Sequence, residues 1–334
     1  MNKPNLFQIA TSELSQDGFF TWLISWADGG NAQHNPELHK VAQGFVRLLL
    51  GKADDFEITK VIAKRQYEKI DIWVAVNDAF NVIIEDKTNT GQHSHQLARY
   101  REIAQAFCEK NNRQLVCVYL KTGNESKASL APVSKNGYTI IDRAKLVGFF
   151  EKHHVQNDIY TDFVSHLKSI DERGMRYRTL PVGEWTYTDW EGFYQLLENK
   201  LNVGGWNYVA NASGGFLGLY WCHLWVEHNN SSPYLQIEQG DLCFKVSIDG
   251  KDRRKQKAVR TEWFSTLMRI ARQEGRSEIR KPARFGAGTT MTCAIVRRMD
   301  WLGADNDLLD EEAVVARLKG YEQFLDKCVK ACQN

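Results

Sequence analysis

Two short apolar segments of this chain carry charged residues at positions that a strand would bury. The charged residues are Asp71 within residues 70–76, and Glu85, Asp86 and Lys87 at the end of residues 80–87. Side chains alternate between the two faces of a strand, so Glu85 and Lys87 share one face and Asp86 takes the other. A carboxylate and an ammonium at the end of a buried strand are costly unless they are paired or hold a metal ion. This pattern is typical of a functional site.

The loop between the two segments decides whether Asp71 joins the other charged residues. In an antiparallel hairpin, residues directly opposite each other share a face. A three-residue loop at residues 77–79 places position 71 opposite position 85, whereas a two-residue loop would shift it to position 84 or 86. Three-residue loops with one residue in the left-handed region are common, and Asn and Asp tolerate that conformation. The site therefore predicts a loop with an odd number of residues, such as the three residues 77–79.

These residue types suit the hydrolysis of a phosphodiester bond. The reaction needs an activated water, neutralised charge on the phosphate and a protonated leaving oxygen. Mg²⁺ prefers hard oxygen ligands, usually one or two carboxylates together with waters. Asp71 and Glu85 would supply those oxygens, and Lys87 would orient or deprotonate the attacking water and offset charge in the transition state. A surface ion pair formed by the same acids and lysine is the alternative.

The order of Asp71, a hairpin and Glu85-x-Lys87 resembles the PD-(D/E)XK nuclease superfamily. Ile70 stands where the superfamily name has proline, which is a frequent departure. The succession of strand, strand, helix and strand is also that of the superfamily. The resemblance covers roughly residues 1–170, about half of the chain, and leaves the second half unmatched.

Two further motifs of the superfamily have counterparts in this sequence. Residues 92–100 resemble the QxxxY helix motif of RecB-type members, with Gln96 and Tyr100 at the matching positions on one helix face. The first helical stretch resembles the helix whose glutamate faces the site, and Glu13 is the residue at that position. Purely structural roles stay open, because Gln96 suits an exposed amide, Tyr100 a core aromatic and Glu13 a first helical turn.

The resemblance implies a metal-dependent nuclease and assigns roles to these residues. The catalytic residues would be Glu13, Asp71, Glu85, Lys87, Gln96 and Tyr100, and the metal ligands would be Asp71, Glu85 and the backbone carbonyl of Asp86. The cofactor would be Mg²⁺, for which Mn²⁺ substitutes, and the substrate would be DNA, in defence against foreign DNA or in repair. Two alternatives stay open: an RNA nuclease, and a non-catalytic module that binds nucleic acid or protein with the same fold.

The elements that position these residues follow a pattern typical of an α/β fold. Apolar spacing predicts, in order, helices at 5–28 and 36–50, strands at 56–66, 70–76 and 80–87, a helix at 94–110, strands at 114–120 and 138–141, and helices at 143–152 and 158–170. Pro36 at a helix start and Gly51 after its end fit the usual helix boundaries. We expect a mixed sheet flanked by helices, which is the restriction-endonuclease-like core that the resemblance implies.

A polar segment that ends in proline, residues 171–181, is expected to separate two domains. We assign residues 1–172 to the nuclease-like domain and residues 182–334 to an accessory domain that binds nucleic acid or a partner. The second domain is expected to be α+β with an antiparallel sheet, from helices at 187–202, 252–274 and 310–331 and strands at 206–210, 216–226, 233–238, 241–248 and 289–297. The aromatic residues that alternate along these strands are expected mainly in the sheet core.

The composition is that of an ordinary globular protein, with 43% hydrophobic and 25% charged residues. The apolar run at residues 19–27 is too short to span a bilayer, which takes about 20 apolar residues, so no membrane partner is expected. Seven cysteines without a CxxC pair argue against a disulfide framework or a zinc ribbon. We expect a cytoplasmic protein. Its oligomeric state is open, and a homodimer is one option.

The small net charge of +2 conceals a strongly basic stretch. Residues 251–298 contain 14 Lys or Arg against four acids, a balance of +10, so the rest of the chain sums to −8. Concentrated positive charge of this kind binds phosphate polyanions. The sequence predicts a nucleic-acid-binding surface made of Arg253, Arg254, Lys255, Lys257 and Arg260, with a solvated helix face as the alternative. His93 and His95 are not spaced for a metal pair on one helix face, and we expect them in a solvated loop.

Overall fold

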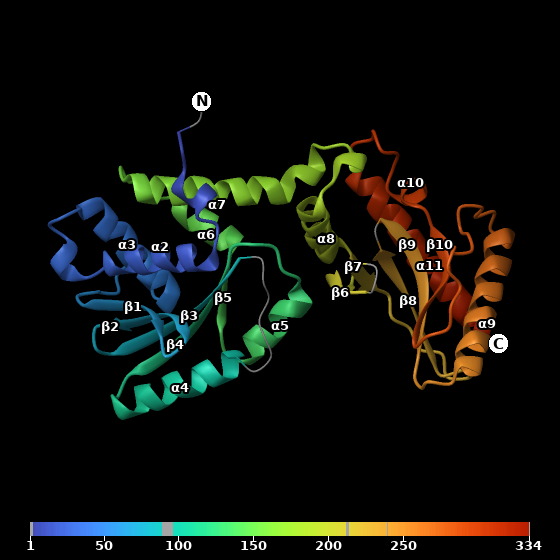
Figure 1. Ribbon diagram of the computed structural model, residues 1–334, viewed down its shortest axis with the longest axis horizontal. Helices are drawn as coiled ribbons and strands as arrows, with labels where there is room; N and C mark the ends of the chain where they lie inside the picture. Colours follow the sequence, from blue (N-terminus) through green and yellow to red (C-terminus); the bar gives the residue numbers. More distant parts are fainter. Residues whose placement is uncertain (1–2, 89–95, 212–213, 239, 334) are drawn as a thin grey trace. The chain divides into compact units, whose positions relative to one another are not determined.

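We analysed a computed structural model of the protein, which describes residues 3–88, 96–211, 214–238 and 240–333. The chain forms two compact units. The first unit contains residues 1–125 and 129–173, and the second contains residues 126–128 and 174–334. Each unit is a sheet with helices packed on it (Figure 1). The assignment of the two units as independently folding domains stays a prediction.

The sheet of the first unit has five strands in the order β1-β2-β3-β4-β5. The strands are β1 (Val61–Tyr67), β2 (Ile70–Val76), β3 (Phe80–Lys87), β4 (Gln114–Lys121) and β5 (Thr139–Asp142). Neighbours among β1, β2 and β3 are antiparallel, whereas β3, β4 and β5 are parallel. This mixed sheet with helices on both sides confirms the predicted α/β fold class.

The β2–β3 hairpin has a three-residue loop, which is the odd count that the sequence predicts. Val76 pairs with Phe80 and Ile72 pairs with Ile84, and the same register places Asp71 opposite Glu85. The loop residues Asn77 and Asp78 both have left-handed backbones, with φ of 52° and 54°. The Asn77 side-chain oxygen accepts hydrogen bonds from the backbone N–H groups of residues 59 and 60, which fixes the loop against the segment before β1.

Seven α-helices flank this sheet among the described residues. They are α1 (Leu6–Ile9), α2 (Glu13–Ser25), α3 (Pro36–Leu50), α4 (Gln96–Lys110), α5 (Lys127–Lys135), α6 (Arg143–Phe150) and α7 (Asp158–Met175). The predicted helix over residues 5–28 is wrong as one element, because Ser12 has an extended backbone and caps a new helix with its side chain. The sequence also gave no indication of α5, which contains Pro132.

The strand β3 is buried along its whole length because helices cover both faces of the sheet. Figure 1 shows α2, α3 and α6 on one side and α4 on the other. One hydrophobic cluster lies between the sheet and α2, α3, α6 and α7, and includes Phe20, Phe45, Ile84 and Phe163. A second cluster lies on the α4 side and includes Trp73, Ile83, Tyr100 and Tyr119. The charged end of β3 therefore belongs to a strand that is buried on both faces of the sheet.

The second unit is an antiparallel sheet in the order β10-β9-β8-β7-β6. Its strands are β6 (Val203–Val209), β7 (Phe216–Trp221), β8 (Ser231–Glu238), β9 (Asp241–Ile248) and β10 (Thr290–Val296). Its helices are α8 (Tyr187–Lys200), α9 (Arg253–Gln273), α10 (Arg298–Trp301) and α11 (Glu311–Gln333), and 3₁₀ turns at Arg176–Arg178 and Val182–Glu184 precede α8. The predicted α+β fold with an antiparallel sheet is confirmed, and the short helix α10 is an addition.

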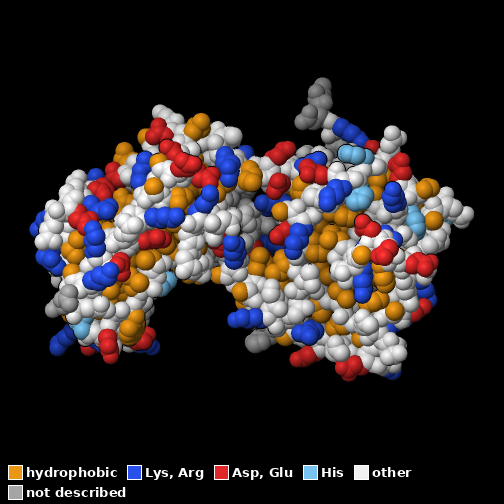
Figure 2. Space-filling view, turned by 180° about the vertical axis from the view of Figure 1, so that it is seen from behind, with side chains coloured by type: hydrophobic (Ala, Val, Ile, Leu, Met, Phe, Trp, Pro, Cys, Tyr) orange, Lys and Arg blue, Asp and Glu red, His pale blue; other side chains and the backbone are white. Residues whose placement is uncertain are grey.

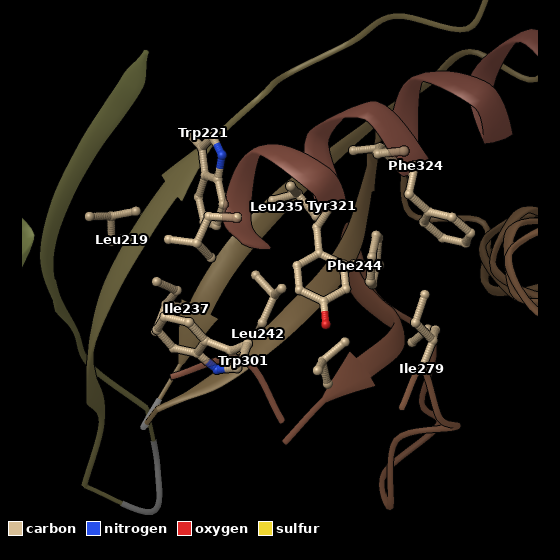
Figure 3. Close-up of a cluster of buried hydrophobic side chains, with 14 of the residues drawn as sticks. Leu219, Trp221, Leu235, Ile237, Leu242, Phe244, Ile279, Trp301, Tyr321 and Phe324 are labelled. Atoms are coloured by element: carbon tan, nitrogen blue, oxygen red, sulfur yellow. The ribbon is translucent and has the colours of Figure 1, made fainter. Parts of the chain in front are cut away.

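The second unit has its own hydrophobic core, in which α11 packs on the sheet (Figure 3). The Phe244 ring on β9 meets the rings of Tyr321 and Phe324 on α11 edge-on, with centroids 6.1 and 5.5 Å away. Trp206, Trp221 and Tyr234 are buried as the strand pattern predicts, whereas Tyr208 and Trp225 are exposed. Tyr177 also belongs to this core, so the unit begins before the predicted position 182.

No helix in the described residues is long and apolar enough to cross a bilayer.

Candidate active site

Three carboxylates and one lysine meet at the end of β3. The Lys87 Nζ atom lies 2.6 Å from Glu85 Oε1, 3.8 Å from Asp71 Oδ2 and 3.9 Å from Glu13 Oε2. We call Glu13, Asp71, Glu85 and Lys87 the acid–lysine cluster. Glu85 is 1% exposed and the Lys87 side chain 9%, so the cluster is screened from bulk water on most sides. The residues that the sequence analysis grouped together are therefore adjacent in space.

Both oxygens of the Asp71 carboxylate accept hydrogen bonds. Oδ2 accepts from the backbone N–H of Asp86 at 3.0 Å, across the β2–β3 pair. Oδ1 accepts from the side-chain amide nitrogen of Gln66 at 3.2 Å. The Asp71 carboxylate is therefore held by β3 on one side and by β1 on the other.

Glu13 reaches the site from the first turn of α2. Its Oε1 atom accepts a hydrogen bond from the backbone N–H of Thr88, one residue beyond β3, at 3.0 Å. Ser12 caps the helix by accepting a hydrogen bond from the N–H of Ser15, which fixes the start of α2 at this point. Glu13 therefore stands in the first turn of the helix and also faces the site, so the two roles do not exclude each other.

Gln96 and Tyr100 approach the cluster from α4. The Gln96 amide nitrogen donates to Glu85 Oε1 at 3.0 Å and to the Tyr100 hydroxyl at 3.1 Å. Tyr100 is 5% exposed and its ring belongs to the hydrophobic cluster on the α4 side. Gln96 therefore contacts the acid–lysine cluster directly, and Tyr100 both packs in the core and supports the Gln96 amide.

A second buried lysine, which the sequence analysis did not identify, lies on the neighbouring strand. The parallel register pairs Lys87 with Lys121 and Glu85 with Tyr119, so these side chains share one face of the sheet. Lys121 is 2% exposed, and its Nζ atom lies 3.3 Å from Glu125 Oε2. The Tyr119 hydroxyl donates to the same Glu125 oxygen at 3.1 Å. Only the pairing of two parallel strands brings this lysine beside the cluster.

Behind the cluster, the side chain of Asp86 pairs with Asp17, a residue that the sequence analysis did not identify. Asp86 points to the α2 side of the sheet, where its Oδ1 accepts from the Gln16 amide at 2.5 Å. The carboxyl groups of Asp17 and Asp86 interact and influence each other's pKa, and Asp17 is 2% exposed. Gln16 and Asp17 follow Glu13 by three and four residues, so helical spacing is the signal that identifies them.

Burial dominates the protonation of the cluster. Burial, and then the nearby charge of Asp71, raise the pKa of Glu85 to about 7, although the ammonium of Lys87 acts in the opposite direction. For Lys87 burial alone would lower the pKa, but Glu85, Asp71 and Glu13 together raise it above its ordinary value. Lys87 is therefore an ammonium at neutral pH, and Glu85 is close to its titration point in the metal-free protein.

The Asp17–Asp86 pair holds a proton more tightly than ordinary carboxyl groups do. Burial, and then the charge of Asp71, raise the pKa of Asp17 to about 6. Burial and the charge of Asp17 raise the pKa of Asp86 well above its usual range. Two buried carboxyl groups in contact cannot both ionise without repulsion, so they share one proton.

The oxygen atoms of the cluster fit a hard divalent cation. Glu85 Oε2 is buried and has no hydrogen-bond partner in the described part of the chain. The backbone oxygen of Asp86 accepts a hydrogen bond from Lys87 Nζ at 3.2 Å, so it lies at the same point. The described residues contain no group of three or more His, Cys, Asp or Glu arranged to hold a metal. Two carboxylates and one carbonyl suit Mg²⁺, which keeps several waters, and do not suit a zinc site with four protein ligands.

The predicted nucleic-acid-binding residues lie at the start of α9, except for one. Arg253, Arg254, Lys255 and Lys257 are all exposed, and we call them the α9 basic surface. Figure 2, in which α9 lies at the left edge, shows Lys and Arg side chains along that edge. Arg260 does not belong to this surface, because it is 5% exposed and its guanidinium stacks 3.6 Å from the Phe285 ring centroid. The periodicity of the helix turns Arg260 inward, where it also donates to the backbone oxygen of Gly286.

His93 and His95, which were expected in a solvated loop, lie outside the described residues.

Comparison with protein-family models gave one match. Residues 5–179, slightly more than half of the chain, match the model described as the PD-(D/E)XK nuclease superfamily. The matched range contains the acid–lysine cluster, Gln96, Tyr100 and all of the sheet β1–β5. It does not identify a branch, so the RecB-type assignment stays a prediction. Searches of curated proteins and of solved structures gave no significant match.

Proposed function

This chain belongs to the PD-(D/E)XK nuclease superfamily, and from that membership we propose that it is a divalent-metal-dependent nuclease that hydrolyses the phosphodiester bonds of DNA. Proteins of the superfamily are generally nucleases and typically use divalent metals. The observation that supports the proposal most strongly is the convergence of Asp71, Glu85 and Lys87 at the end of β3. A sheet end that had no chemical role would not need two acids and a lysine with so little exposure.

The metal ligands in this proposal are the carboxylates of Asp71 and Glu85 with the backbone carbonyl of Asp86. A bound Mg²⁺ neutralises charge on the phosphate and lowers the pKa of a coordinated water. The side chains hold the ligands in place: Gln96 donates to Glu85, and the Asp86 N–H donates to Asp71. Mn²⁺ is expected to substitute, since it accepts the same oxygen ligands.

Lys87 has two roles that follow from its charge and position. Its ammonium lies between Glu85 and Asp71, so it compensates their negative charge before a cation binds. Because its pKa is raised, Lys87 is a hydrogen-bond donor at neutral pH, which suits orientation of a water and stabilisation of a phosphorane-like transition state. Deprotonation of the water then requires the lowered pKa that a bound cation provides.

The proposal is tested by incubating linear and circular DNA with the purified protein and Mg²⁺ or Mn²⁺. We expect cleavage that falls by roughly 100-fold or more in Asp71→Ala, because one of the two metal-binding carboxylates is lost. Lys319→Ala is the matched control, since this lysine is exposed on α11 and lies in the second unit. Cleavage that survives Asp71→Ala would show that a contaminant is responsible.

The same assay decides the finer points of the proposal. Cleavage of circular DNA identifies an endonuclease, and cleavage of linear DNA alone identifies an exonuclease. RNA incubated in parallel tests the RNA nuclease alternative. Binding without any cleavage would favour the non-catalytic module. The cytoplasmic location and the setting in defence or repair stay predictions from the resemblance.

We also propose that the α9 basic surface binds the phosphate backbone of the substrate. Four cations occupy the first five residues of α9, where the positive end of the helix dipole makes cations unfavourable. In the described part of the chain none of the four forms an ion pair, so their charge is available to a polyanion. Contacts of this kind position a duplex without reading its sequence.

A further inference from the structure

One residue of the β1–β2 turn has a strained backbone inside a strand. Gln66 has φ of 52°, although it belongs to β1 and lies between the paired residues Arg65 and Tyr67. The register of its neighbours places Gln66 opposite Asp71 on β2. Left-handed backbones are unfavourable for residues with a side chain, and they persist where surrounding contacts enforce them, frequently at functional sites.

The side chain of Gln66 joins two acids. Its amide nitrogen donates to Asp71 Oδ1 at 3.2 Å and to Asp17 Oδ2 at 3.2 Å. One nitrogen with two protons thus serves two carboxylates from different elements, β2 and α2. Because an amide carries no net charge, it holds these carboxylates without replacing a cation between them.

Asp17 is the partner that holds the Gln66 side chain in place. It is 2% exposed and lies on α2, the helix that also carries Glu13. The other oxygen of Asp71 is already held by the backbone N–H of Asp86. With Gln66 in place, both oxygens of Asp71 are restrained and its carboxylate plane is set relative to Glu85.

We propose that Gln66 is a positioning residue that orients the Asp71 carboxylate for a divalent cation, with Asp17 as its anchor. The inference rests on the proposed function, since it assumes that Asp71 binds the cation. Donors that hydrogen-bond to a metal-binding side chain fix its orientation, and their loss typically weakens metal affinity about 10- to 100-fold. The contact of Gln66 with both acids accounts for its left-handed backbone.

Two substitutions separate positioning from backbone structure. Gln66→Gly removes the amide and relieves the left-handed backbone, so the fold should keep or gain thermal stability. Gln66→Asn also tolerates the left-handed backbone and keeps an amide, but is one methylene shorter and cannot reach both acids. Lys69→Gly is the matched control, because Lys69 has φ of 65° in the same turn and forms no hydrogen bond or ion pair with Asp71 among the described residues.

The measurement is Mn²⁺ affinity by isothermal titration calorimetry, together with the melting temperature in EDTA. We expect Gln66→Gly and Gln66→Asn to raise the Mn²⁺ dissociation constant about 10- to 100-fold with no fall in melting temperature. Lys69→Gly should leave the dissociation constant unchanged. In the cleavage assay, the two Gln66 variants should need more Mn²⁺ for half-maximal rate and approach the wild-type rate at saturation.

The possible results also separate this inference from the proposed function. If the wild-type protein binds Mn²⁺ and both Gln66 variants bind it equally well, the inference is wrong and the proposed function stands. If Lys69→Gly weakens binding as much as Gln66→Gly does, turn conformation and not the amide is responsible, and the inference is again wrong. If the wild-type protein does not bind Mn²⁺, both are wrong.

Discussion

At the scale of single residues, the site is a set of buried charges. Contacts between these charges offset the free-energy cost of burying them. Lys87 compensates Glu85 and Asp71, and Gln96 donates to Glu85. Behind them Asp17 and Asp86 avoid repulsion by sharing a proton. Each of these arrangements lowers the cost of charge in a region of little solvent, and each leaves the carboxylate oxygens of the cluster close together.

The raised pKa of Asp17 predicts that the stability of the protein depends on pH. A folded-state pKa of about 6 exceeds the unfolded value of 3.8, so between these values the folded protein binds more protons than the unfolded protein. The free energy of unfolding therefore falls as pH rises from about 4 to 7, and Glu85, with a pKa of about 7, acts in the same direction. Asp17→Asn removes one of the two groups and allows its amide to donate to Asp86.

We expect Asp17→Asn to gain stability relative to the wild-type protein between pH 5 and pH 8, by roughly 1–3 kcal/mol at the upper end. Urea unfolding of both proteins in EDTA at the two pH values provides the measurement. Equal pH dependence in the two proteins would show that Asp17 does not titrate in this range.

At the scale of elements, the β2–β3 hairpin is the feature that makes the site. Its three-residue loop sets the register, and the register places Asp71 opposite Glu85. The start of α2 and the start of α4 then bring Glu13 and Gln96 to the same strand end. Elements far apart in the sequence contribute one polar side chain each, and these side chains meet at the end of β3.

The α9 basic surface allows a test in which binding weakens while stability is kept. Replacing Arg253, Arg254 and Lys257 by Glu places acids in the first turns of α9, where the helix dipole favours them, so the melting temperature should not fall. Loss of three phosphate contacts should weaken binding to all DNA sequences and reduce the slope of log K against log salt by about 3.

The control for this test has the same change in net charge. Lys319, Lys327 and Lys330 are exposed on α11, and replacing them by Glu should leave the salt slope near that of the wild-type protein. DNA binding can be measured by fluorescence anisotropy over a range of salt concentrations. An unchanged slope in the α9 variant would support the alternative of a solvated helix face.

At the scale of the whole molecule, the described residues form two separate cores, which have no residue in common. The first unit has hydrophobic clusters on both faces of β1–β5, and the second has one cluster around β6–β10. The division lies near the predicted polar segment, but α7 continues to Met175 and Tyr177 already belongs to the second core.

We predict that each unit folds alone when its core is kept intact. Residues 1–175 retain all of α7, and residues 174–334 retain Tyr177, so these are the fragments to express. Each should unfold cooperatively in thermal circular dichroism, and the first should keep Mn²⁺ binding while losing affinity for DNA. A fragment 1–175 that is unfolded in buffer would show that the two units depend on each other.

The sequence by itself determined the local parts of the site. Alternation along β3 fixes which of Glu85, Asp86 and Lys87 share a face, and the Asn77-Asp78-Ala79 loop fixes the register that brings in Asp71. Helical spacing likewise fixes that Gln96 and Tyr100 lie together. These are short-range consequences of backbone geometry, and they survive any packing of the elements.

Tertiary structure alone decided the contacts between elements. It placed Lys121 beside Lys87 through the parallel pairing of β3 with β4, and it brought Asp17 of α2 to Gln66 of β1. It also turned Arg260 into the protein, where Phe285 covers it. Periodicity gives the face of an element but not the partner that this face meets, because the partner depends on how helices and strands pack over long sequence separations.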